Sequence, residues 1–247
     1  MSFFKSLFGK KNSIQDLAVL GVDMHSHLIP SIDDGVKTVD EAIKIIKRFS
    51  QLGYKKIITT PHIMAGGYDN TPEIILKGRD EVREAIENEE IDIKFEAAAE
   101  YYLDERFLKY IEEKSLLTFG DNQVLFELSF LNKPNNLDQA IFDMQTQGYQ
   151  PILAHPERYP FFYEKDLSTY KDIRAKGVAL QINLFSLVGG YGKGAQKIAE
   201  KMIDEDMIDY VGSDIHRPQQ FVFLEKCLKN EYVEKLLNSE RIKNKYL

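Results

Sequence analysis

The stretch AVLGVDMHSH, residues 18–27, is a short apolar segment that ends in two histidines. Its length and its valines predict a buried strand with the histidines just past its C-terminal end. Six more segments of this kind follow, and stretches with the spacing of amphipathic helices separate them. The seven predicted strands are residues 18–24, 56–60, 91–99, 123–128, 151–154, 178–183 and 208–212.

Helices are predicted between these strands. The clearest is residues 38–52, because Thr38 and Glu41 have the spacing of a capping box and Gly53 follows as a stop signal. Gly148 and Gly177 follow two of the others in the same way. The other predicted helices are residues 73–88, 135–147, 165–176, 195–206 and 219–237.

The alternation of strands and helices predicts an α/β fold. A parallel strand needs a crossover helix to return, so we expect a TIM-barrel-like barrel of seven strands, closed or nearly closed. An open doubly wound sheet is the alternative, since periodicity does not separate the two. The 247 residues contain no Pro- or Ser-rich linker. Residues 18–247 are therefore predicted to form one domain after an N-terminal tail, residues 1–17.

The composition excludes several classes of protein. A formal net charge of −7 and a pI near 5.4 argue against nucleic acid as a partner, which needs clustered Lys and Arg. The single cysteine, Cys227, excludes a disulfide framework and a cysteine-rich zinc site, and it indicates a reducing compartment. A thiol-based phosphatase is disfavoured too, because Val233 stands six residues later, where such enzymes carry arginine.

No segment approaches the eighteen or so apolar residues of a membrane span, and the first dozen residues lack a secretory apolar region. We therefore expect a cytoplasmic protein without a transmembrane segment. The tail at residues 1–17 combines lysines with phenylalanines. It is predicted to be a frayed end or a short helix covering the barrel bottom. The alternative is a basic amphipathic helix that places the protein peripherally at the inner face of the membrane.

All five histidines lie at or just past the C-terminal end of a predicted strand. His25 and His27 follow the first, His62 the second, His155 the fifth and His216 the seventh. In a parallel barrel these ends meet at one face, so we expect a shared site. His25 and His27 are two residues apart in extended chain and therefore share a face, which suits chelation of a metal ion.

Carboxylates accompany these histidines. Glu127 is the most informative, because a charged group in the apolar strand 123–128 is costly unless it is paired or metal-bound. Asp33 and Asp34 are weaker candidates, since Asp-Gly is also a turn signal. The remaining candidates are Glu100 and Asp214. Mixed imidazole and carboxylate ligands accept several metals, so the sequence does not select one.

Two arginines and one glycine-rich segment stand beside this cluster. Arg158 and Arg217 follow the last two histidines, and a guanidinium can donate to two phosphate oxygens at once. Residues 190–195 partly match a dinucleotide-binding fingerprint but follow the sixth predicted strand instead of the first. We expect instead a flexible active-site loop in which Tyr191 or Lys193 contacts a phosphate group.

These motifs together resemble the polymerase and histidinol phosphatase (PHP) superfamily over residues 21–218. Within it they look most like the metal-dependent protein-tyrosine phosphatases of bacterial capsule and exopolysaccharide gene clusters. The matching motifs are Asp23-Met-His25-Ser-His27, Asp33-Asp-Gly35, Thr60-Pro-His62, Glu100, Glu127, Ala154-His155-Pro-Glu-Arg158 and Ser213-Asp214-Ile-His216.

The resemblance implies a distorted seven-stranded barrel that holds two or three metal ions, usually manganese, with iron or zinc as alternatives. It implies that Arg158 is catalytic. Arg217 directly follows the last motif, earlier than a second arginine would be expected. The resemblance therefore supports a catalytic role less strongly for Arg217 than for Arg158. The implied metal ligands are His25, His27, Asp34, His62, Glu100, Glu127, His155, Asp214 and His216.

The implied reaction is hydrolysis of protein phosphotyrosine by a metal-activated hydroxide that attacks phosphorus in line. A phenolate, with a pKa of about 10, is a fair leaving group. The implied protein partner is a membrane-anchored bacterial tyrosine kinase. A small-molecule phosphatase of the histidinol-phosphate type, a nuclease or nucleotide phosphatase, and a non-enzymatic metal-stabilised module that binds a tyrosine-rich kinase tail remain alternatives.

Overall fold

A computed structural model of the chain describes residues 14–164 and 166–247. Its strands pair only in parallel and form two sheets, with the orders β1-β2-β4 and β3-β5-β6-β7-β8-β9. The α/β fold and the parallel arrangement are confirmed. The strands are β1 (Val22–Asp23), β2 (Lys56–Thr59), β3 (His62–Ile63), β4 (Lys94–Ala97), β5 (Glu100–Tyr102), β6 (Gln123–Glu127), β7 (Gln150–Ala154), β8 (Ala179–Asn183) and β9 (Tyr210–Gly212).

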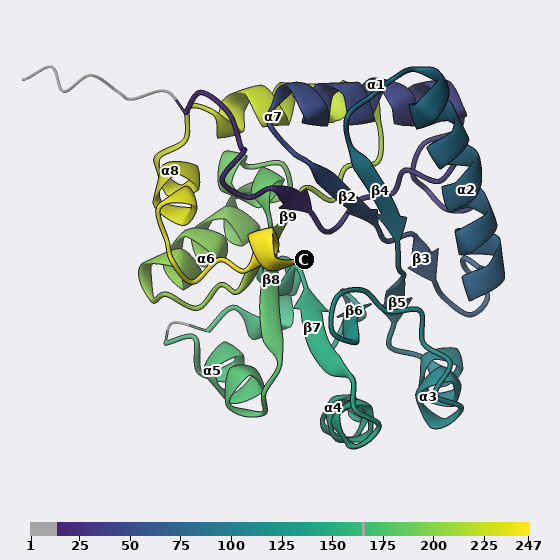
Figure 1. Cartoon of the computed structure of the whole chain (residues 1–247). Coiled ribbons are helices and arrows are strands. Elements are labelled where there is room, and N and C mark those ends of the chain that lie inside the picture. Colours follow the sequence, from purple (N-terminus) through teal and green to yellow (C-terminus); the bar gives the residue numbers. More distant parts are fainter. Residues whose placement is uncertain (1–13, 165) are drawn as a thin grey trace, which may run out of the picture.

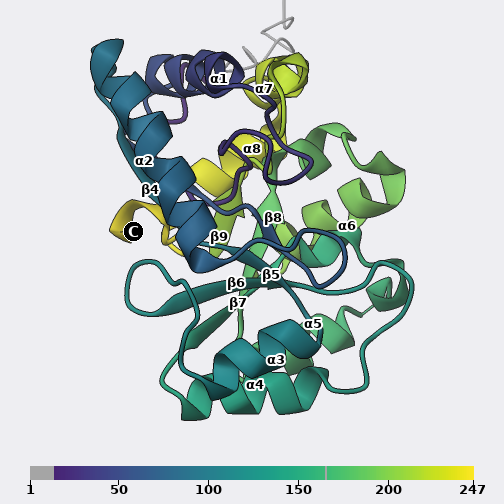
Figure 2. The same cartoon turned by 90° about the vertical axis from the view of Figure 1, so that its right-hand side faces the viewer.

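The helices surround the strands, as both views of the molecule show (Figure 1, Figure 2). The α-helices are α1 (Val39–Gln51), α2 (Pro72–Asn88), α3 (Glu105–Glu112), α4 (Leu137–Thr146), α5 (Ser168–Ala175), α6 (Gly192–Asp204), α7 (Phe221–Cys227) and α8 (Glu231–Leu237). The 3-10 helices are η1 (Pro156–Arg158), η2 (Pro160–Phe162), η3 (Leu184–Val188), η4 (Pro218–Gln220) and η5 (Asn244–Tyr246).

Two predicted strands are each followed by a further short strand that was not predicted. The predicted strand 56–60 corresponds to β2, and after Pro61 the chain continues into β3 in the other sheet. The predicted strand 91–99 corresponds to β4, and β5 follows it in the other sheet. Backbone hydrogen bonds continue across these breaks, from Ala98 to Thr59 and from Glu100 to Pro61. Proline has no N–H to donate, so the regular ladder stops there.

β1 and β9 adjoin each other without forming a ladder. A single parallel bridge joins Ser26 to Ile215 at one end. At the other end the buried side chain of Asn244 donates to the carbonyls of Val22 and Val211 and accepts from the N–H of Val211, over 2.7–2.9 Å. A residue near the C-terminus therefore joins the first strand to the last.

The buried apolar side chains form two clusters. The larger one lies between the strands and the surrounding helices. The smaller one contains residues from both sheets, among them Val22, Ile58, Ile152 and Tyr210, and Leu247 packs against it. The C-terminus accordingly lies at the centre of the ring of helices (Figure 1).

The predicted helix ends are partly confirmed. Thr38 caps α1 by accepting from the N–H of Glu41, but the Glu41 carboxylate accepts from Lys37 and so does not complete a capping box on Thr38. The single helix predicted at residues 219–237 is wrong: α7 and α8 are separate, because the Asn230 side chain accepts from the first N–H groups of α8 and starts a new helix there.

The predicted flexible loop at residues 190–195 is also wrong. The chain passes from η3 through a short turn into α6, which begins at Gly192, three residues before the predicted start. The turn is set by Gly189 and Gly192, whose φ angles of 77° and 90° favour glycine. Helical hydrogen bonding thus includes Lys193 and leaves Tyr191 at the N-terminus of α6.

Residues 14–17 pack against the body of the protein, with Leu17 buried and its N–H bonded to the carbonyl of Leu52. The predictions for the N-terminal tail, a frayed end or a helix covering the barrel bottom and the alternative of a basic amphipathic helix, fall mostly on residues 1–13, which lie outside the described residues. Within residues 14–164 and 166–247, no helix is both long and apolar enough to cross a membrane.

Candidate metal centre

All nine predicted metal ligands lie together. They come from the segments after β1 and β9, from the start of β3 and β5, from the last residue of β6 and from the residue after β7. They form four overlapping groups in which the candidate ligand atoms lie within 4.8 Å of one another. The groups are His27, Asp34, His62 and His216; His25, His27 and Glu100; His25, His155 and Asp214; and His62, Glu100 and Glu127.

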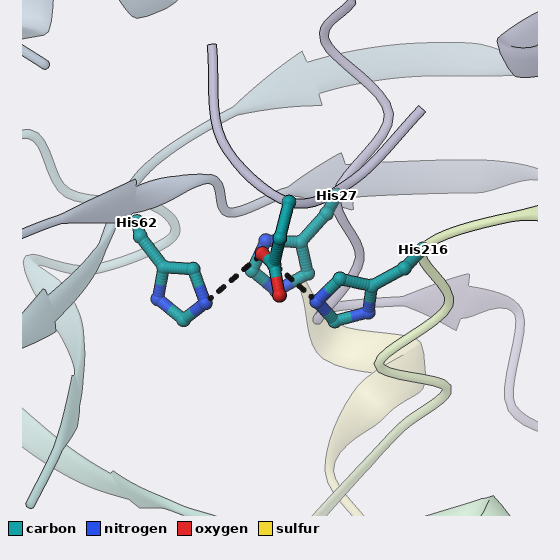
Figure 3. A group of neighbouring side chains, drawn as sticks. His27, His62 and His216 are labelled. Carbon is teal, nitrogen blue, oxygen red and sulfur yellow. Dashed lines mark ion pairs between the residues drawn. The ribbon is translucent and has the colours of Figure 1, made fainter. Parts of the chain in front are cut away.

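Three histidines from distant parts of the chain meet in the first group. His27, His62 and His216 converge on one space (Figure 3), and the rings of His27 and His216 stack at 4.0 Å between centroids. Asp34 places Oδ1 3.4 Å from Nε2 of His216 and 3.6 Å from Nε2 of His62. The carboxylate therefore stands between two imidazoles, an arrangement that suits the binding of a metal ion.

Glu100 belongs to two of the other three groups. Its Oε2 lies 3.1 Å from Nε2 of His25 and 3.3 Å from Nδ1 of His62, and its Oε1 lies 2.9 Å from Nε2 of His155. Glu127 adds a second carboxylate oxygen 3.1 Å from Nδ1 of His62. A carboxylate shared by several imidazole groups is suited to bridge two metal ions.

Glu100 and Asp214 are buried, and their surroundings favour the ionised form. Burial opposes the ionised form of Glu100, but the neighbouring His25 and His62 outweigh it and hold the pKa of this carboxyl well below its usual value. The pKa of Asp214 is lowered in the same way, chiefly by His25 against the effect of burial. Nε2 of His27 is buried and has no hydrogen-bond partner among the residues that the structure describes. Ionised carboxylates beside an unpartnered ring nitrogen fit the binding of cations.

The outer nitrogens of three histidines are held by other groups. Nδ1 of His25 donates to Oε1 of Gln181 over 2.8 Å, and Nδ1 of His216 donates to the carbonyl of Asp214 over 2.9 Å. Nδ1 of His27 lies 2.8 Å from Oδ2 of Asp33. Each contact leaves Nε2 directed into the cluster, which is the arrangement that metal-ligating histidines require.

The two adjacent aspartates have different positions. Asp33 is buried behind His27, whereas Asp34 is half-exposed and faces the cluster. Gly35 allows the loop to pack this tightly, because a Cβ there would lie 2.3 Å from the His27 carbonyl and 2.9 Å from Asp33 Oδ1. Of the two adjacent aspartates, Asp34 is therefore the one whose carboxylate faces the candidate ligands.

Asp23 joins the first and last motifs. Its carboxylate accepts from the backbone N–H of Ser213 over 2.8 Å and from its hydroxyl over 3.0 Å. Burial raises the pKa of Asp23 to about 7. The contact fixes the segment that carries Asp214 beside the one that carries His25.

A pocket of about 290 Å³ opens onto the cluster. Arg158 lies in its wall, with Nη1 3.0 Å from Oδ2 of Asp214 and its guanidinium carbon 4.2 Å from the ring centroid of Tyr191 and 4.8 Å from that of Phe130. Arg217 lines the exposed rim of the pocket. Lys193 is exposed on α6 and is not among the lining residues, so the structure does not bring it to the site.

Sequence reasoning missed Phe130, Gln181 and Asn183. Phe130 follows β6 in a loop and carries no spacing signal. Gln181 and Asn183 did carry a spacing signal, because polar residues two apart on an apolar strand share a face. In the structure this face is directed toward His25 and Asp214.

The fold and the cluster define an α/β protein with a cluster of candidate metal ligands and an arginine in the pocket beside them. The chain belongs to the family described as "Capsular polysaccharide synthesis, CpsB/CapC", whose model matches residues 21–245. It is 29% identical to the tyrosine-protein phosphatase YwqE of Bacillus subtilis over 196 residues, which cover 79% of this chain and 77% of YwqE.

Solved structures give the same result. A crystal structure from a study of YwqE from Bacillus subtilis and CpsB from Streptococcus pneumoniae, described as "unique metal-dependent tyrosine phosphatases", matches with a TM-score of 0.76 and 26% identity, covering 91% of this chain and 90% of that one. Histidinol phosphate phosphatase from Lactococcus lactis matches with a TM-score of 0.52 and 14% identity, over 90% of this chain and 94% of that one. This second likeness shows the fold alone.

Proposed function

We propose that this protein hydrolyses phosphotyrosine in proteins at a centre of two or three metal ions. The observation that carries the proposal is the convergence of five imidazoles and four carboxylates beside Arg158. The relatives support the substrate class, because YwqE and CpsB are tyrosine phosphatases and depend on metal.

The ligand set supports more than one ion. Four residues each belong to two of the groups, so the groups do not describe four independent sites. These residues are His25, His27, His62 and Glu100. Two or three ions with shared ligands account for them, and manganese is our preferred metal, with iron or zinc as alternatives. Bound metal would activate a water molecule and withdraw charge from the phosphoryl oxygens.

We assign the binding of the phosphoryl group to Arg158. Nη1 is engaged by Asp214, and the structure gives the guanidinium no other hydrogen bond within the described chain, so its remaining N–H groups are available to phosphate oxygens. Met64 and Phe130 form an apolar part of the pocket wall, which suits an aromatic leaving group. Arg217 is placed to contact substrate at the rim, and we assign no phosphoryl contact to Lys193.

We further propose that the two sheets together form a distorted seven-stranded barrel, supported by the small core cluster that both sheets share and by the bridge between Ser26 and Ile215. The proposed protein partner is a membrane-anchored bacterial tyrosine kinase, and the proposed location is the cytoplasm. The family's link to capsular polysaccharide synthesis supports this choice of partner.

The test is a substrate panel on metal-reconstituted protein. We expect release of phosphate from a phosphotyrosine peptide at a kcat/KM at least about 100-fold above that for the matched phosphoserine peptide or histidinol phosphate, because a phenolate leaves more readily than an alkoxide. The Arg158→Ala variant should lose about 100-fold or more in kcat. Arg48→Ala, which removes a guanidinium from the outer helix α1, is the matched control and should retain full activity.

Preference for histidinol phosphate would overturn the substrate assignment and favour the small-molecule alternative. Tight binding of the phosphotyrosine peptide without turnover, in protein shown to contain metal, would favour the non-enzymatic module.

A further inference from the structure

The two oxygens of the Asp214 carboxylate have different surroundings. Oδ2 accepts three hydrogen bonds, from Nδ2 of Asn183 over 2.6 Å, from the hydroxyl of Tyr191 over 2.8 Å and from Nη1 of Arg158 over 3.0 Å. Oδ1 faces the cluster, 3.4 Å from Nε2 of both His25 and His27. An oxygen that already accepts three donors has no lone pair left for a metal ion, so only Oδ1 is available.

Among these three donors, Tyr191 contacts two parts of the site, one through its hydroxyl and the other through its ring. Its hydroxyl donates to Asp214, and its ring lies against the guanidinium of Arg158, with 4.2 Å from the guanidinium carbon to the ring centroid. A cation over an aromatic face is attracted to it and loses rotational freedom. One side chain thus contacts both a candidate metal ligand and the candidate phosphate-binding group.

The scaffold behind this contact is fixed. Gln181 donates through Nε2 to Oδ1 of Asn183 over 2.9 Å and accepts from His25 through its other amide atom. The backbone N–H of Asn183 donates to the buried carboxylate of Glu157. The orientation of the Asn183 amide is therefore determined, and Asp214 is held from β8 on one side and from the start of α6 on the other.

We propose that Tyr191 is a positioning residue that couples Asp214 to Arg158. Its hydroxyl holds Asp214 with a single oxygen facing the metal site, and its ring holds the guanidinium beside it. The inference rests on the proposed function, because it takes Asp214 as a metal ligand and Arg158 as the phosphate-binding group. It replaces the expectation that Tyr191 contacts phosphate directly.

The two roles are separable by substitution. Tyr191→Phe keeps the ring and removes the hydroxyl, and we expect the affinity of the metal-depleted protein for Mn²⁺, measured by calorimetric titration, to fall about 10-fold, as for other groups that orient metal ligands. At saturating Mn²⁺ the inhibition constant for inorganic phosphate should stay within about 2-fold of wild type.

Tyr191→Leu also removes the ring. Relative to Tyr191→Phe, it should weaken phosphate inhibition by a further 2- to 5-fold or so, the loss expected for one cation–π contact. In an Arg158→Ala background this further loss should disappear, since the ring then has no guanidinium to hold. A purely structural role for the ring would leave the loss in place.

The matched control is Tyr232→Phe. It removes a phenol that donates to an aspartate, Asp204, on the outer surface, and it should change neither constant. Unchanged Mn²⁺ affinity in Tyr191→Phe with weaker phosphate inhibition would overturn the proposal in favour of direct phosphate contact. A ring effect that persists without Arg158 would overturn it as well. If wild-type protein itself binds neither Mn²⁺ nor iron or zinc, the proposed function fails instead, and the two failures are thereby distinguished.

Discussion

Replacing Asn244 by alanine should destabilise the protein far more than its position near the C-terminus suggests. The side chain is fully buried and makes three hydrogen bonds, of 2.7, 2.9 and 2.9 Å, to the backbone of Val22 and Val211. β1 and β9 do not form a ladder, so these bonds satisfy the backbone groups that a neighbouring strand would otherwise satisfy.

The size of the effect follows from the groups that are left without partners. Each buried N–H or carbonyl that loses its hydrogen bond costs about 1–3 kcal/mol. The space vacated by the amide can admit a water molecule, so we take the lower half of the summed range of about 3–9 kcal/mol and expect a loss of about 3–6 kcal/mol. That is a large part of the roughly 5–15 kcal/mol that stabilises a typical domain.

Urea unfolding followed by circular dichroism measures this loss, with wild type and variant compared at the same metal concentration. Asn88→Ala, at the exposed end of α2, is the matched control and should change the free energy of unfolding by less than about 0.5 kcal/mol. The Mn²⁺ affinity of folded Asn244→Ala should match wild type, because the candidate ligands lie at the opposite ends of the strands. A loss below about 1 kcal/mol would refute the argument that Asn244 substitutes for strand pairing.

Three further outcomes are expected. The double variant His25→Ala/His27→Ala should hydrolyse no phosphotyrosine peptide while its circular dichroism spectrum stays that of the folded protein, and full activity in metal-loaded variant would remove the metal assignment. Chelation of the metal should lower stability to thermal unfolding, and metal restored at 100 times its dissociation constant should return about 2.7 kcal/mol for each site filled; identical melting with and without metal is the contrary result. Burial raises the pKa of the Cys227 thiol to about 12, so a thiol reagent at pH 8 should leave native protein unmodified and fully active and should react only after unfolding, whereas inactivation of folded enzyme would contradict this.

The candidate ligands could be named from the sequence because chain direction determines where they lie. In parallel strands the C-terminal ends meet at one face, so residues such as His62 and His155 converge even though 93 residues separate them. Glu127 could be identified because burying a carboxylate in an apolar strand is energetically costly, and the structure places it at the last position of β6.

The groups that orient these ligands could not be predicted in the same way. Gln181 contacts His25 across 156 residues, and that pairing depends on the register of β8 against its neighbours, which apolar spacing does not reveal. The strands β3 and β5 were also missed, because they contain only two and three residues and begin after the apolar segments 56–60 and 91–99 end. Local sequence thus predicted which residues reach the site, whereas strand register decides what holds them there.

The charge of the pocket determines the order in which metal ions and substrate bind. Four carboxylates line it, from Asp34, Glu100, Glu127 and Asp214, against the two arginines Arg158 and Arg217. A phosphate ester placed there without metal would meet a net negative wall, and like charges about 4 Å apart repel by roughly 4 kcal/mol near a protein surface. The two or three divalent ions that we propose would reverse that sign. An acidic protein can therefore bind an anionic substrate, provided that its metal ions bind before the phosphate does.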